Sequence, residues 1–124
     1  MELTMDAICK LRYQRYGRRK VGQLLDQIRG KSLLEAQQIL AAIPMRSTEL
    51  VGKAVKSAGA NLAVKLGRKL DLKTVWVKIA FADQGPMKAL KRVQPGPQGR
   101  AMPFKRKMCH VTVTVSDTKE AKGK

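Results

Sequence analysis

The stretch that decides the fold is QGPMKALKRVQPGPQGRAMPFKRKMCHVTVTVS, residues 84–116. It contains no Asp or Glu, and its centre, QPGPQG at residues 94–99, consists of residue types that turn a chain and interrupt strand pairing. The segment carries seven cations: Lys88, Lys91, Arg92, Arg100, Lys105, Arg106 and Lys107. A basic segment with a Pro/Gly centre is typical of a turn that lies against an anionic partner.

Alternating apolar residues flank this basic segment on both sides. Before it, Val75, Val77, Ile79 and Phe81 fall on one predicted face, with Trp76, Lys78 and Ala80 on the other. After it, Cys109, Val111, Val113 and Val115 alternate with His110, Thr112 and Thr114. A period of two residues predicts β-strands. Together the two strands predict a long β-hairpin over residues 84–107, too long for a small domain to cover.

The first half of the chain predicts one strand and three helices. Residues 3–12 alternate loosely and predict a strand beside the hairpin base. A basic loop over residues 13–20 leads into the first helix, which carries an apolar stripe at Val21, Leu24, Leu25 and Ile28 and is followed by a capping glycine at residue 30.

Capping and breaking residues define the next two helices. Ser32 and Glu35 form a capping-box pattern, and Pro44 ends that helix. The third helix is predicted over residues 46–65, closed by Gly67, and its small-residue run at 57–60 predicts close packing. The predicted fold is therefore α+β: a three-stranded antiparallel sheet packed on three helices, with a protruding β-hairpin. We expect a single domain over residues 1–115 and a polar, disordered tail over residues 116–124.

Composition points to a polyanionic partner. The 124 residues include 26 Lys and Arg against 9 Asp and Glu, a formal net charge of +17. Nucleic acid fits this charge best, with an anionic membrane surface as a weaker candidate. No apolar run is long enough to span a bilayer, and the N-terminus MELTMDAICK does not look like a secretory signal. We interpret Cys9 and Cys109 as reduced strand residues rather than a disulfide.

Catalytic and metal-binding patterns are not found in the sequence. His110 is the single histidine, and structural or RNA-facing hydrogen bonding is its expected role. The carboxylates are scattered, so we predict no enzyme activity, no metal site and no cofactor. The GPQG sequence at residues 96–99 matches a bare G-x-x-G pattern, but that RNA-binding loop joins two helices, whereas this one lies between predicted strands.

Four motifs resemble the large-subunit ribosomal protein twenty-two family. IRGKS at residues 28–32 resembles the junction between its first two helices, and SAGAN at 57–61 resembles a motif of its third helix. The Gly85–Pro86 pair, with Lys91–Arg92 and the GRA sequence at 99–101, resembles the ascending arm and tip. KRK at 105–107 with HVTV at 110–113 resembles the descending arm and last strand. The resemblance covers residues 7–115.

The resemblance implies a structural protein that binds large-subunit ribosomal RNA, aids subunit assembly and lines the nascent-peptide exit tunnel. Its partners would be that RNA, neighbouring large-subunit proteins and the nascent polypeptide, without a membrane or a homo-oligomer. The expected location is the ribosome of a bacterial cytoplasm, with an organellar ribosome as the alternative. The residues expected to face RNA, from the basic clusters and the resemblance, are Arg15, Arg18, Arg19, Lys20, Lys31, Lys88, Lys91, Arg92, Arg100, Lys105, Arg106, Lys107 and His110. The expected tunnel tip is Val93, Gln94, Pro95, Gly96, Pro97, Gln98 and Gly99.

Two departures from the family pattern limit what carries over. Gly17–Arg18 stands where the family has Ser-Pro, so the first helix lacks that N-cap and its proline start. The sequence QPGP at residues 94–97 replaces a tip that commonly reads R-P-R-A. The competing hypothesis is an architectural DNA-binding protein with a basic β-arm, in which Pro95 or Pro97 wedges between base steps. It predicts binding to duplex DNA and dimer formation.

Overall fold

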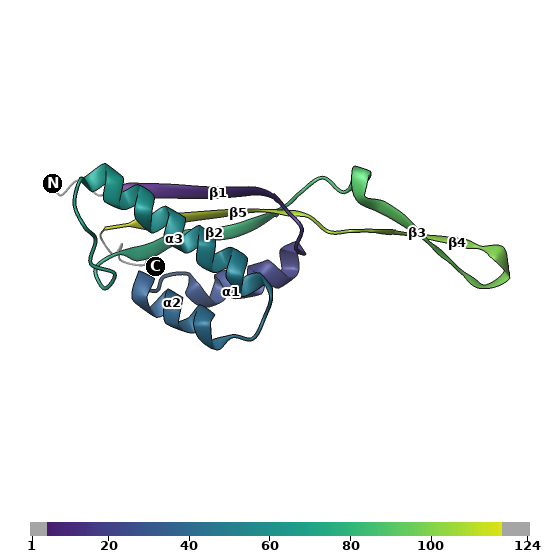
Figure 1. Cartoon of the computed structure of the whole chain (residues 1–124), viewed down its shortest axis with the longest axis horizontal. Helices are drawn as coiled ribbons and strands as arrows, with labels where there is room; N and C mark the ends of the chain where they lie inside the picture. The colour runs from purple at the N-terminus through teal and green to yellow at the C-terminus, as the bar shows by residue number, and fades with distance from the viewer. Residues whose placement is uncertain (1–4, 118–124) are drawn as a thin grey trace, which may run out of the picture.

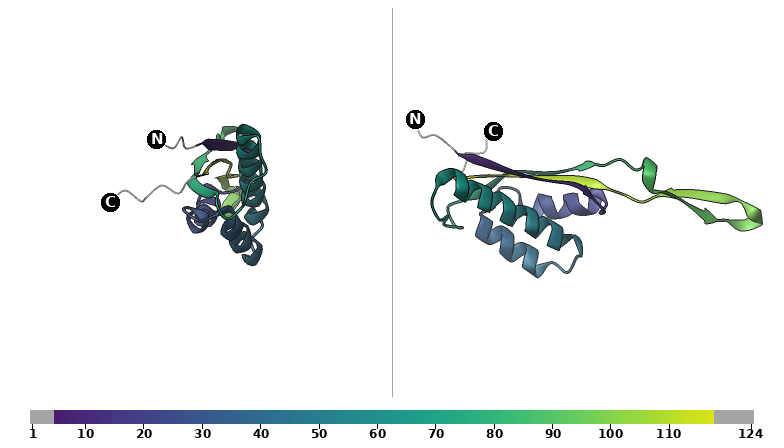
Figure 2. Two further views of the ribbon diagram at one scale, coloured as in Figure 1. Left: turned by 90° about the vertical axis from the view of Figure 1, so that its left-hand side faces the viewer. Right: turned by 45° about the horizontal axis from the view of Figure 1, so that its top comes forward.

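The computed structural model describes residues 5–117 and consists of a body and an extended arm (Figure 1). Three helices cover one face of a three-stranded antiparallel sheet in the body (Figures 1 and 2). The helices are α1 (Arg18–Ile28), α2 (Leu33–Ala42) and α3 (Ser47–Leu66). The sheet has the order β1-β5-β2, with β1 (Asp6–Gln14), β5 (Cys109–Ser116) and β2 (Trp76–Gln84). This arrangement confirms the predicted α+β class.

The arm is a separate two-stranded antiparallel sheet. It consists of β3 (Lys91–Pro95) and β4 (Ala101–Lys105), joined through a short 3₁₀ turn, η2 (Pro97–Gly99). A second 3₁₀ turn, η1 (Lys88–Leu90), leads into β3. Pairing runs from Lys91 opposite Lys105 to Pro95 opposite Ala101, so Gln94 and Pro95 belong to the ladder, contrary to the prediction that residues 94–99 do not pair. We call residues 91–105 the arm. Residues 85–90 and 106–108 connect it to the body, which consists of residues 5–84 and 109–117.

The structure confirms the predicted residues that begin α2 and end α3. Ser32 Oγ accepts a hydrogen bond from the Glu35 backbone N–H, and Glu35 accepts one from the Ser32 N–H, which confirms the capping box. Gly67 ends α3 in a left-handed conformation (φ 67°). A Cβ added at Gly59 would lie 3.2 Å from Leu33 Cδ1, so this glycine allows α2 and α3 to pack closely.

The core lies between the helices and the inner face of the sheet. Alternate residues of β5, from Cys109 to Val115, are fully buried, and Ala7 and Cys9 of β1 join them. α3 packs on β1 and β5, whereas α1 packs on β2. Both cysteines are buried and unpaired, as predicted, and burial raises the pKa of the Cys109 thiol.

One predicted face of β2 is wrong beyond Val77. The register against β5 shifts between Val77 and Ile79, so Lys78 is an extra residue in the strand. An inserted residue moves every later side chain to the opposite face. Ala80 is therefore buried at 1% exposure, whereas Ile79 and Phe81 are 44% and 40% exposed.

The ends of several elements also differ from the predicted ones. β1 begins at Asp6 and continues to Gln14, past the predicted end at residue 12. α1 begins at Arg18, so residues 18–20 form its first turn rather than a loop. Ser116 is a strand residue at 1% exposure, not the start of a tail, and the Asp117 backbone N–H donates to Met5 O. The remainder of the predicted tail, residues 118–124, lies outside the described residues.

Both edges of the body sheet are occupied by the chain itself. Along β1, Asn61 Nδ2 donates to Ile8 O at 3.1 Å, and Lys65 Nζ donates to Asp6 O at 2.6 Å. Along β2, the α1–α2 connection pairs like a short strand: Gly30 N–H donates to Val77 O, and Val77 N–H donates to Lys31 O. Because exposed strand edges recruit further strands, these contacts reduce the length of each edge that is open to strand addition. The IRGKS motif, residues 28–32, thus supplies the backbone groups that pair with the edge of β2.

Candidate nucleic-acid interface

The basic residues predicted to face RNA lie in three regions. Arg15 lies between β1 and α1, followed by Arg18, Arg19 and Lys20 in the first turn of α1. The arm and its connections carry most of the others: Lys88 in η1, Lys91 and Arg92 in β3, Arg100 after the turn, Lys105 in β4, and Arg106 and Lys107 before β5. All of these side chains are exposed. Lys31 lies apart from both groups. It follows the end of α1, whose 11 residues span about 16 Å from the first turn that carries Arg18.

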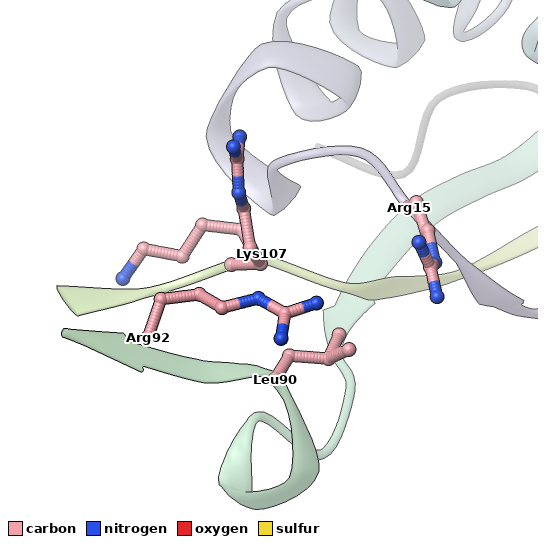
Figure 3. Close-up of a pocket in the computed structure, with 5 residues that line it drawn as sticks. Arg15, Leu90, Arg92 and Lys107 are labelled. Carbon is pink, nitrogen blue, oxygen red and sulfur yellow. The ribbon is translucent and has the colours of Figure 1, made fainter.

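A cavity of about 380 Å³ forms where the arm joins the body (Figure 3). We call it the cation pocket, and its lining residues are Arg15, Leu90, Arg92, Arg106 and Lys107. Figure 3 shows the Arg92 side chain extending toward the body, on the side where Arg15 lies. Four cations from three segments of the chain thus surround one cavity. The sequence analysis selected all four cations but did not predict that Arg15 shares a cavity with residues of the arm, and it missed Leu90.

No carboxylate of the described chain neutralises the pocket. The ion pairs within residues 5–117 are Arg29 with Asp26 and Lys78 with Asp6, both at 2.8 Å and both in the body. Among these residues, no group of His, Cys, Asp and Glu is placed to hold a metal ion. The Arg106 guanidinium lies over the Phe104 ring, at 5.8 Å from the ring centroid, and neither ion pair involves a cation of the pocket. The pocket is therefore suited to an anion with several oxygen acceptors.

The start of α1 borders this pocket. Gly17 is the N-cap residue, and no side chain caps the helix, as the missing Ser-Pro predicted. A Cβ at Gly17 would lie 4.0 Å from Lys107 Cβ, which places the helix start beside the chain that leaves the arm. The free backbone N–H groups of a helix N-terminus favour anions. The helix start thus adds to the positive potential that the side chains create.

The two faces of the arm differ in chemistry. Lys91 pairs with Lys105 on one face, and Arg92 pairs with Phe104 on the other, because neighbouring strand residues alternate sides. Every residue of β3 and β4 is exposed. The arm therefore has no buried residue within the described chain, and it presents cations on both faces.

His110 has a structural role in this fold. Its Nδ1 accepts a hydrogen bond from the Tyr13 backbone N–H at 2.9 Å, and the two rings meet edge to face at 4.9 Å. Tyr13 has a left-handed backbone (φ 58°) within the irregular pairing between Leu11 and Gln14. His110 thus fixes the bend that carries the chain from β1 toward Arg15. Its Nδ1 lone pair is used inside the protein.

Comparison of the chain with known proteins identifies its family. The family model described as "Ribosomal protein L22p/L17e" matches residues 9–116. A protein of Brachyspira hyodysenteriae named large ribosomal subunit protein uL22 is 39% identical over 120 residues, covering 97% of this chain and 87% of that protein. Proteins of the same name from Pelotomaculum thermopropionicum and Acaryochloris marina are 42% and 44% identical, over 94% and 89% of this chain and 99% and 88% of theirs. The chain therefore belongs to the ribosomal protein L22p/L17e family.

Proposed function

We propose that this protein is a structural component of the large ribosomal subunit that binds large-subunit ribosomal RNA. Its relatives bear the name of a large-subunit protein. The observation that carries the RNA-binding proposal is the arm: all of β3 and β4 is exposed, and residues 84–116 contain cations without a single carboxylate. An exposed arm with unbalanced charge is stabilised when phosphate groups surround it, since binding releases condensed counterions from the RNA.

The arm is suited to shape and phosphate recognition more than to base reading. Lys91 and Lys105 offer ammonium groups on one face, and Arg92 offers a guanidinium on the other. Such contacts position a protein on RNA without reading its sequence. We propose that body and arm contact different RNA segments and so aid subunit assembly, next to neighbouring large-subunit proteins.

The end of the arm is proposed to line the nascent-peptide exit tunnel. Its turn, residues 96–99, carries no charge, and the first cation beyond it is Arg100. The four turn residues add no charge of their own to the surface that a passing polypeptide meets. The tip therefore contributes shape to the tunnel wall, and the cations nearer the body supply the RNA contacts.

The test is sedimentation of the tagged full-length protein from cell lysate through a high-salt gradient. High salt removes loosely held basic proteins from nucleic acid. We expect the protein to migrate with the large ribosomal subunit. Release to the top of the gradient contradicts the proposal, and migration with chromosomal DNA instead supports the architectural DNA-binding hypothesis.

No helix among residues 5–117 is long and apolar enough to cross a membrane.

A further inference from the structure

The connection between the body and the arm has few internal contacts. The body sheet ends where Gln84 pairs with Cys109, and the arm sheet begins where Lys91 pairs with Lys105. In the described chain, two backbone hydrogen bonds cross the intervening segments: Gly85 N–H to Met108 O at 2.8 Å and Arg106 N–H to Leu90 O at 3.1 Å. The arm itself buries no residue, so the packing that supports its orientation comes from the connecting residues, chiefly the buried Gly85 against Met108. The orientation of the arm depends on this narrow connection.

The cation pocket spans that connection. Arg15 belongs to the body, Arg92 belongs to the arm, and Arg106 and Lys107 lie in the segment between them. Without an anion, these four positive charges repel one another across the joint. Salt screens this repulsion only partly, because the four groups line one cavity. An anion in the cavity reverses the sign of the interaction and draws the same groups together.

We propose that the cation pocket binds one phosphate group and that this phosphate fixes the arm relative to the body. A guanidinium donates two parallel hydrogen bonds to neighbouring phosphate oxygens, so Arg92 and Arg15 can hold one group from opposite sides of the joint. Leu90 forms an apolar wall, which keeps part of the cavity from water and strengthens the ionic contacts. The inference rests on the proposed function in one respect, namely that ribosomal RNA supplies the phosphate.

The test measures arm orientation and anion binding in the full-length protein. Spin labels are attached at Gln38→Cys on α2 and Ala101→Cys on β4, both exposed positions, whereas the native Cys9 and Cys109 are buried. Inorganic pyrophosphate is the first probe and a short single-stranded RNA is the second. We expect each probe to narrow the distribution of label-to-label distances and to raise the melting temperature, in a saturable manner.

Two double variants separate the pocket from general charge. Arg92→Gln with Arg106→Gln removes two pocket cations, and we expect pyrophosphate affinity to fall by about tenfold for each lost charged hydrogen-bond donor, with no narrowing at the same concentration. Lys91→Gln with Lys105→Gln removes the same charge from the other face of the arm. This control should bind pyrophosphate within about threefold of the unmodified protein, and its distance distribution should still narrow.

Each outcome bears on one of the two proposals. A distance distribution that pyrophosphate leaves unchanged in the unmodified protein overturns the inference, and so does an equal loss of affinity in the two double variants. RNA binding without narrowing overturns the inference while leaving the proposed function intact. Narrowing by pyrophosphate in a protein that does not sediment with the large subunit supports the inference and contradicts the proposed function.

Discussion

Replacing Gly85 by alanine tests how the arm is joined to the body. A Cβ at this position would lie 3.1 Å from Met108 Cγ and 3.2 Å from both the carbonyl carbon and oxygen of Met108. The side chain can move aside, but the backbone of β5's neighbouring segment cannot move without loss of the Gly85 N–H to Met108 O hydrogen bond. Overpacking of this kind typically costs about 1–3 kcal/mol. The smaller entropy of the unfolded alanine chain offsets about 0.4–1 kcal/mol of that cost.

We expect the free energy of unfolding of Gly85→Ala to fall by about 1–2 kcal/mol, equivalent to roughly 3–8 °C in melting temperature. Chemical denaturation gives the first quantity, and amide hydrogen exchange reports whether the Gly85 N–H loses protection. Gly52→Ala is the matched control, because nothing lies within 4 Å of the added Cβ in α3 and alanine favours the helix by up to about 1 kcal/mol. Unchanged stability together with unchanged protection of the Gly85 amide would refute the steric argument.

Three further predictions concern packing, RNA contact and pH. Gly59→Leu should lower the free energy of unfolding by about 1–3 kcal/mol by overpacking α2 against α3, and unchanged denaturant unfolding would contradict the close packing. Neutralising Lys91, Arg92 and Arg100 together should reduce the slope of log K against log salt for single-stranded RNA by about 2, at about 0.7 for each lost phosphate contact, so an unchanged slope means that the arm does not touch phosphate. The hydrogen bond from Lys78 is the main cause that lowers the pKa of Asp6 below its usual 3.8, so the stabilisation is present above that pH and is lost as the pH falls through the lowered pKa. Asp6→Asn should therefore show a weaker dependence of stability on acid pH than the unmodified protein, and an identical acid unfolding curve would contradict the pairing.

The sequence by itself determined the elements and the overall chemistry of this protein. Apolar periodicity placed three helices and the body strands, because each element must turn one face to the core. Ser32 and Glu35 fixed the start of α2, and Gly67 fixed the end of α3, through local backbone hydrogen bonding that the residue types specify. The excess of Lys and Arg, and the absence of carboxylates in residues 84–116, indicated an anionic partner without any knowledge of the fold.

Tertiary structure alone decided the register, the edges and the pocket. The extra residue at Lys78 exposes Ile79 and Phe81, and no local pattern announces it because the strand sequence still alternates. That Arg15 and Arg92 line one cavity depends on how β1, the bend at Tyr13 and the arm are arranged around β5. Contacts between residues far apart in sequence follow from packing of whole elements, so a single sequence specifies the cations while the fold specifies which of them share one cavity.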